Sequence, residues 1–146
     1  MEDKQMKMAS WLNDLLEISK DNPQMNAEQL LGLCGRGCAQ FQGAIEGVKQ
    51  LKELAKDCEN RADYVEFFRS ILHINANEES DGILLRLEKP YCTCPMAPEV
   101  KGGMLCNCTR GHELYVWSEF FGKPIDVEIV ESHLRGGKDC VIKIIV

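Results

Sequence analysis

The sequence predicts an α+β fold, in which an N-terminal helical segment packs on a C-terminal antiparallel sheet with a helix. Three patterns lead to this expectation. Apolar residues recur at three- and four-residue spacing through about residue 75, as in amphipathic helices. Beyond residue 82 they alternate with polar residues, as in half-buried strands. Helices and strands are therefore largely segregated along the chain, which is typical of α+β proteins.

Four helices are expected in the first half of the chain. The apolar stripe of the first helix consists of Met8, Trp11, Leu12, Leu15 and Leu16. A short second helix begins at Asn26, and a third spans about residues 38–58. Gly43 and Gly47 lie one turn apart on the third helix, which predicts close helix packing there. A fourth helix follows Asn60, which is a suitable N-cap.

The second half is expected to form three strands and one helix. The polar segment 76–82 separates the two halves as a linker, and 83–88 follows it as a strand. Thr109 is a fair N-cap for a helix that a glycine closes. Two further strands, 125–133 and 140–146, are joined by a glycine-containing connection that indicates a hairpin.

These elements divide the chain into a helical segment at 1–75, the linker at 76–82 and an α+β ligand-binding-like domain at 83–146. Together they are expected to form one compact unit, because 146 residues suffice for a single domain with an ordinary core. Hydrophobic residues at 45% and charged residues at 27% indicate a globular protein. The residues expected either to cover the sheet or to form a homodimer face are Trp11, Leu15, Phe67 and Phe68.

Charge and cysteine content narrow the function classes. Lys and Arg total 17 against 23 Asp and Glu, and the net charge of −6 disfavours a nucleic-acid partner. No signal-peptide pattern and no run of about 18 apolar residues occurs, so we expect a cytoplasmic protein without a membrane partner. Thiols stay reduced in that compartment. The eight cysteines therefore point to metal or redox chemistry rather than to structural disulfides.

Six of the cysteines are closely spaced. They form the pairs Cys34/Cys38, Cys92/Cys94 and Cys106/Cys108. In an extended chain residues i and i+2 point to the same side, so each C-x-C pair can present two thiols together. If the two C-x-C segments run side by side, four sulfurs converge within a hairpin. Cys34 and Cys38 are one helical turn apart and are auxiliary candidates.

The four thiols of the two C-x-C pairs predict a metal site. Zinc is preferred, because it binds thiolate and imidazole ligands tetrahedrally, and His112 can add a nitrogen. An iron–sulfur cluster is less expected, since the spacing matches none of the ferredoxin patterns. The alternative is that several cysteines are small buried hydrophobic residues, which is the expectation for Cys58 and Cys140.

Thiol catalysis is a second hypothesis. Cys108 lies just before the expected helix, where the positive helix end lowers the pKa of a thiol. His112 would then be the base, and a carboxylate such as Glu113 or Glu131 would orient it. The opposing interpretation places His112 and Glu113 on a solvated helix face. A third hypothesis is a redox switch formed by Cys34 and Cys38.

Three segments near the C-terminus carry a family resemblance: Leu105–His112, Gly122–Ser132 and Arg135–Ile144. They resemble the end of 4-vinyl reductase-type small-molecule-binding domains, in which a helix leads into a G-x-P strand and then a cysteine-bearing strand. They are also similar to the bacterial L-2-amino-thiazoline-4-carboxylate hydrolase-like proteins, which carry a comparable cysteine-bearing turn before that helix. The resemblance covers about residues 83–146. The matching positions are Cys106, Cys108, Cys140, Gly122, Pro124, Ser132 and Gly136.

The resemblance implies an internal pocket for a small, often apolar ligand, with cysteines as metal ligands in some members. The chain departs from the family's pattern at Val141 and Ile142, where an aromatic residue is usual, and adds a second C-x-C pair. The leading prediction is a small-molecule-binding or sensor-like domain with a thiolate metal site. The alternative is a thiol- or metal-assisted hydrolase of a small C–N or C–S ring substrate. In that enzyme Cys108 is the nucleophile or a ligand and His112 is the base.

Overall fold

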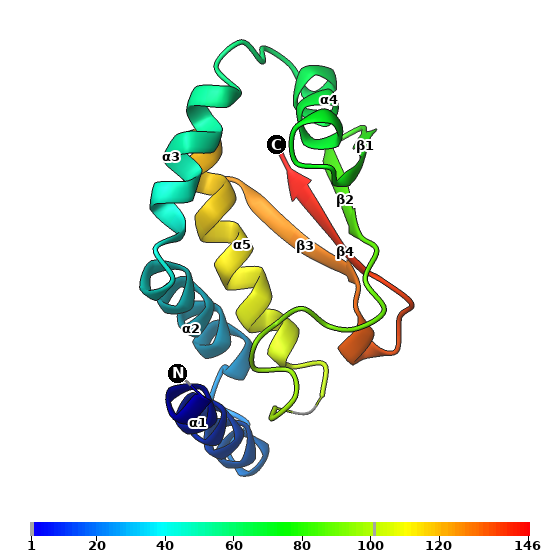
Figure 1. Cartoon of the computed structure of the whole chain (residues 1–146). Coiled ribbons are helices and arrows are strands. Elements are labelled where there is room, and N and C mark those ends of the chain that lie inside the picture. The colour runs from blue at the N-terminus through cyan, green and yellow to red at the C-terminus, as the bar shows by residue number, and fades with distance from the viewer. Residues whose placement is uncertain (1, 101) are drawn as a thin grey trace.

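The computed structural model describes residues 2–100 and 102–146 and confirms the α+β fold (Figure 1). The helices of this described part are α1 (Glu2–Asp21), α2 (Ala27–Phe41), α3 (Ala44–Leu54), α4 (Arg61–Ser70) and α5 (Leu105–Phe121), with a 3-10 turn at His133–Arg135. The strands are β1 (Asn75–Glu79), β2 (Gly82–Leu87), β3 (Asp126–Glu131) and β4 (Cys140–Ile145). Within the same residues, no helix combines the length and the apolar character needed to cross a membrane.

The four strands form one antiparallel sheet in the order β1-β2-β4-β3. The ladder between β2 and β4 runs from the pair Gly82 and Ile145 to the pair Leu87 and Cys140. In Figure 1, α5 lies between this sheet and the α2–α3 pair, while α1 and α4 lie at opposite ends of the molecule. The hairpin expected at the C-terminus is confirmed as β3 and β4.

One end of the molecule is filled by what we call the aromatic core. Its largest members, contributed by α4 and α5, are Phe67, Phe68, Trp117 and Phe120. They pack on the inner face of the sheet, where Ile83 and Ile144 are fully buried. The rings of Phe68 and Trp117 meet edge to face with centroids 5.3 Å apart, an arrangement that aromatic pairs favour. Phe67 and Phe68 are thus core residues and are not available for a dimer face, whereas Trp11 is 65% exposed.

A second, smaller core lies at the α1 end. Its buried members are Ala9, Leu12, Leu31, Met96, Val100, Leu105 and Cys108. Two of these belong to the segment between β2 and α5, described at residues 88–100 and 102–104, which we call the connecting loop. Asn13 on α1 donates a hydrogen bond to the Glu99 carbonyl at 3.0 Å, which fixes the loop against that helix. This core therefore holds an irregular segment in a defined position.

The boundary between the second and third helices differs from the expectation. The second helix continues to Phe41 and includes Cys38, and the next begins only at Ala44. Gly43 separates them with a φ of 68°, a left-handed conformation that glycine adopts without a steric penalty. The prediction of close packing at Gly43 and Gly47 was wrong, since a Cβ at either position would meet no atom within 4 Å.

Two further boundaries differ. The segment expected as a linker, 76–82, forms most of β1 and the turn into β2. Its polar residues face solvent, and Ala76 is fully buried. Because this small residue is the only apolar side chain that β1 directs into the core, the sequence of the segment does not show the alternation typical of a strand. The fifth helix begins at Leu105 rather than after Thr109, and it ends as expected at Gly122, which has a φ of 65°.

Candidate functional site

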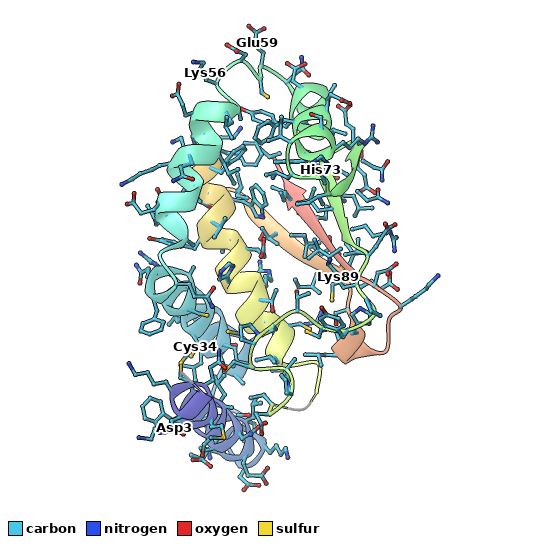
Figure 2. The ribbon with its side chains drawn as sticks, in the orientation of Figure 1. Asp3, Cys34, Lys56, Glu59, His73 and Lys89 are labelled. Atoms are coloured by element: carbon cyan, nitrogen blue, oxygen red, sulfur yellow. The ribbon has the colours of Figure 1, made fainter. Side chains whose placement is uncertain are left out.

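A pocket of about 230 Å³ lies where the connecting loop, α2, α5 and the sheet meet. We call it the thiol pocket. Its cysteine lining consists of Cys38, Cys92, Cys94, Cys106, Cys108 and Cys140, and each is a free thiol. His112, Glu113, Glu131 and Ser132 supply most of its polar lining. Figure 2 labels Cys34 on α2 at this end of the molecule, and Lys56 and Glu59 at the opposite end.

The two C-x-C pairs reach the pocket in different ways. Cys92 and Cys94 lie in the connecting loop, as the sequence predicts for a non-helical segment. Cys106 and Cys108 lie in the first turns of α5, so the expected extended hairpin of four thiols was wrong. Residues two apart on a helix point roughly 200° apart. The second pair therefore divides, with one thiol toward the sheet and the other toward α2.

The divided pair creates two sides of the pocket. On the α2 side, the Cys108 thiol lies near those of Cys94, Cys38 and Cys34. On the sheet side, Cys106 Sγ donates to Ser132 Oγ at 3.1 Å. The thiols of Cys92 and Cys140 lie near that of Cys106 and near each other.

Glycines at the contact between α2 and α5 bring the α2 cysteines to the pocket. A Cβ built on Gly35 would overlap the Cys108 carbonyl oxygen, and one built on Gly111 would overlap the Gly32 carbonyl oxygen. The two helix backbones therefore touch, which small residues alone permit. Cys38 follows Gly35 by one turn, and this close approach places it on the pocket wall.

Hydrogen bonds hold the loop wall of the pocket in place. The Lys89 carbonyl contacts His133 Nε2 at 2.6 Å, near the start of the loop. Near its end, Arg135 Nε donates to the Gly103 carbonyl at 3.2 Å. Both partners lie in the 3-10 turn between β3 and β4. The loop is thus fixed to the same hairpin that carries Cys140.

Burial favours the protonated form of five of the six pocket thiols. Desolvation raises the pKa of Cys38, Cys92, Cys94 and Cys140 above the usual range of a thiol. Its effect is largest at Cys108, where burial, with the nearby Cys94 thiol acting in the same direction, raises the pKa to about 12. Cys108 was expected to be activated by the helix end. Since it lies within the helix and inside a core, desolvation dominates and that expectation was wrong.

A polar chain enters the pocket from the aromatic core. Trp117 Nε1 donates to Glu113 Oε2 at 2.7 Å, and the other carboxylate oxygen of Glu113 lies 3.4 Å from His112 Nδ1. Both His112 and Glu113 line the pocket and are about three-quarters buried. The interpretation as a solvated helix face was therefore wrong. Trp117 was not expected to take part, although its position four residues after Glu113 was a usable signal.

Glu131 supplies a fixed negative charge at the pocket. It accepts hydrogen bonds from the Lys138 backbone at 2.9 Å and from Arg86 at 3.3 Å. These bonds, with the Lys138 amide contributing most, lower the pKa of its carboxyl group. Arg86 also pairs with Asp139 at 2.9 Å. Glu131 is therefore held by other residues and is not a free base.

The comparisons with known proteins now assign a family. Residues 2–146 match the family of unknown function DUF6144. This chain belongs to the DUF6144 family. Among curated proteins there is no match. Among solved structures, the chain is similar to a trafficking protein particle complex subunit 3 from Naegleria fowleri covalently bound to palmitic acid, at 11% identity and a TM-score of 0.47, covering 99% of this chain and 96% of that one. This likeness is too weak to assign a shared fold.

The predicted site residues of this DUF6144 protein can now be placed. All four predicted metal ligands line the thiol pocket, together with the auxiliary candidate Cys38, while Cys34 lies beside Cys108 without lining it. Among residues 2–100 and 102–146, however, no three His, Cys, Asp or Glu side chains are arranged to hold a metal ion. Cys58 packs against the aromatic core as expected.

Cys140 was expected in the core and instead lines the thiol pocket. The reason is its place at the end of the ladder, opposite Leu87, where the sheet stops and the connecting loop begins. A larger hollow of about 610 Å³ between α2 and α5 contains Gly32, Arg36 and Tyr115 but neither cysteine nor histidine. The thiol pocket is therefore the stronger candidate site, because it combines enclosure with reactive side chains.

Proposed function

We propose that this protein binds a small molecule in the thiol pocket, and that zinc held by pocket thiolates is a second, metal-loaded state of the same site. One observation carries the proposal. Six of the eight cysteines, drawn from α2, the connecting loop, α5 and β4, line a single pocket beside the partly buried His112–Glu113 pair. Convergence from four separate segments indicates a built site rather than chance burial.

Pocket size and charge indicate the class of ligand. Ligand pockets commonly measure about 300–1,000 Å³, so about 230 Å³ suits a compact molecule. Protonated thiols and the side chains of Leu87, Ile129 and Ile142 make most of the wall apolar. His112 and Glu131 provide polar groups at the remaining positions. The ligand that fits is compact and largely apolar, with one polar group.

Zinc is supported by the number of thiols that line one pocket. Zinc would have to displace the protons of Cys92, Cys94, Cys106 and Cys108 and draw their sulfurs together, because soft thiolates bind it only after deprotonation. Burial raises the pKa of Cys108 to about 12. Zinc affinity should therefore rise with pH and each binding event should release protons.

The alternative function is a thiol hydrolase. It is favoured by the hydrogen bond from Trp117 to Glu113, which holds the carboxylate beside His112 as in nucleophile–base–orienter arrangements. Cys108 lies one turn before His112 on α5 and lines the same pocket. The raised pKa of Cys108 weakens this alternative, since the nucleophile must be a thiolate.

Small-molecule binding is tested with a mixture of compact aromatic and aliphatic acids, amines and alcohols by ligand-observed NMR. Thr93→Trp places an indole at the pocket, whereas Ser118→Trp adds the same side chain at the separate α2–α5 hollow. We expect compounds that bind the wild type and Ser118→Trp and lose most of their signal with Thr93→Trp. Equal binding to all three proteins, or to none, would refute the pocket as the binding site.

The zinc state is tested on protein purified without oxygen, by titrating zinc against a chromogenic chelator. We expect one zinc per chain, with several thiols protected from alkylation until excess chelator is added. Cys106→Ser and Cys108→Ser should weaken zinc binding by at least about tenfold, while Cys58→Ser, at the other end of the molecule, leaves it unchanged. Binding that survives in both pocket variants would contradict the assignment.

A further inference from the structure

We propose that Cys92 and Cys140 form a reversible disulfide, which makes this edge of the thiol pocket a dithiol redox site. The inference goes beyond the proposed binding function and needs no bound ligand or metal. It concerns a pair that the sequence did not suggest, since 48 positions separate the two residues and neither belongs to the Cys34–Cys38 element considered for redox chemistry.

The fold brings the two residues together through the sheet. Cys140 begins β4 and pairs with Leu87, the last residue of β2. The chain then leaves the sheet and returns Cys92 to the same pocket wall. The contact between Lys89 and His133 at 2.6 Å holds this return against the β3–β4 connection. The ladder therefore positions Cys140, and the contact at Lys89 positions the segment that leads to Cys92.

The two thiols line the same wall of the pocket and lie close to each other, with the Cys106 thiol near both. Cys92 and Cys140 are each partly exposed, so a small oxidant can reach them. Cys92 also lies in a segment without strand pairing, where the backbone can adjust to the narrow geometry that a disulfide requires.

The remaining pocket thiols are less suited to this reaction. Cys106 is buried, and its thiol donates a hydrogen bond to Ser132 Oγ at 3.1 Å. Cys108 is buried in the second core. Cys38 accepts a hydrogen bond from Gln42 at 3.1 Å on the α2 side. Cys94 is partly exposed but lies on the α2 side, near Cys38. Cys92 and Cys140 are the two partly exposed thiols on the sheet side of the pocket.

The oxidant in the proposed reaction is a low-molecular-weight disulfide. Cys92 first loses its proton to solvent. Its thiolate then attacks one sulfur of that disulfide, the S–S bond breaks, and one small thiolate leaves and takes up a proton. Cys140, after losing its proton to solvent, attacks the Cys92 sulfur of the mixed disulfide and displaces the second small thiolate. Two protein thiols are oxidised, and one small disulfide is reduced to two thiols.

The disulfide would join the loop wall of the pocket to the first residue of β4. In the reduced protein this part of the loop is held by hydrogen bonds and apolar contacts alone. In the oxidised protein a covalent bond would fix it. Oxidation should therefore reduce the rate at which buried pocket thiols such as Cys108 become accessible to alkylating reagents, because that access requires movement of the loop.

The test equilibrates the full-length protein in mixtures of reduced and oxidised glutathione with a metal chelator present, followed by acid quenching, alkylation and peptide mapping. We expect a single intramolecular link between the peptides that contain Cys92 and Cys140, reversed by excess reductant. Cys92→Ser and Cys140→Ser should each abolish it, and Cys58→Ser, which lies against the aromatic core, should form it as the wild type does. Circular dichroism establishes that each variant is folded.

Three results would overturn the proposal. The first is a wild-type link between any other two cysteines as the main product. The second is the absence of an intramolecular disulfide even in the most oxidising mixture. The third is unchanged oxidation of two thiols in both folded pocket variants. The first two results are read from the wild-type peptide map alone. The proposal can therefore be refuted even if one of the variants does not fold.

Discussion

The two ends of this molecule differ in how tightly their side chains pack. At the aromatic core, large side chains from α4 and α5 interlock over the sheet, and Phe68 is fully buried. At the thiol pocket, glycines let α2 and α5 touch, an irregular loop replaces a strand, and about 230 Å³ is left open among free thiols. The first end provides stability, whereas the second leaves room for a ligand or for chemistry.

Helix α5 belongs to both ends. Its C-terminal half places Trp117 and Phe120 in the aromatic core, and its N-terminal half places Cys106 and Cys108 at the pocket. The indole nitrogen of Trp117 links the two halves through its bond to Glu113. The aromatic core therefore orients a side chain that lines the thiol pocket.

The largest expected effect lies in the aromatic core. Phe68→Ala removes a fully buried ring and should lower the free energy of unfolding by about 3–5 kcal/mol in urea denaturation. Phe68→Leu should cost less, about 1–2 kcal/mol, and keeps the test usable if the alanine variant does not fold. Leu33→Ala, at a position 60% exposed, should change stability by less than about 0.5 kcal/mol. Similar decreases in the free energy of unfolding for the Phe68 and Leu33 variants would show that Phe68 contributes no more to stability than a surface residue.

A smaller effect is expected where the two helices touch. Gly111→Ala would press a methyl group onto the Gly32 carbonyl and should destabilise the protein by about 1–3 kcal/mol, since backbone cannot move aside as a side chain can. Gly37→Ala, on the exposed face of α2 with free space around its Cβ, should instead be neutral or stabilising by up to about 1 kcal/mol. Alkylation of Cys38 should accelerate in the first variant only. Equal behaviour of the two variants would show that α2 and α5 do not depend on this close approach.

The smallest expected effect is a pH dependence at the pocket. The Cys108 thiol ionises near pH 9 in the unfolded chain, but burial raises its pKa to about 12 in the folded protein. The unfolded state therefore loses its proton first, and the free energy of unfolding should fall as pH rises from about 9 to about 12. Cys108→Ala should make this decline shallower, as measured by urea denaturation across that range. Parallel curves for the two proteins would indicate that the Cys108 thiol is not desolvated.

Much of the fold could be predicted because its signals are local. The fourth helix after Asn60, the end of the fifth at Gly122 and the C-terminal hairpin follow from caps and alternation within a few residues. The failures have a common cause. β1 was missed because its ladder partner, not its own polar sequence, makes it a strand. The start of α5 was missed because tertiary packing of Leu105 and Cys106 outweighs the absence of a capping side chain.

The candidate site was predicted in part for the same reason. Cysteine spacing correctly brought Cys92, Cys94, Cys106 and Cys108 to one pocket, although through a helix rather than a hairpin. Spacing could not place Cys140, because its neighbours in space come from the far end of a β-ladder. The small-molecule ligand, the zinc state and a homodimer stay predictions.

The sequence alone determined the class of fold, the positions of most helices and strands, and the concentration of thiols around residues 92–108, because periodicity, caps and residue type act over short distances. Only the tertiary structure decided which thiols meet. The direct contact of α2 with α5 through Gly35 and Gly111 added Cys38, and the register of β2 with β4 added Cys140. Such contacts join residues far apart in the chain, and no local pattern records them.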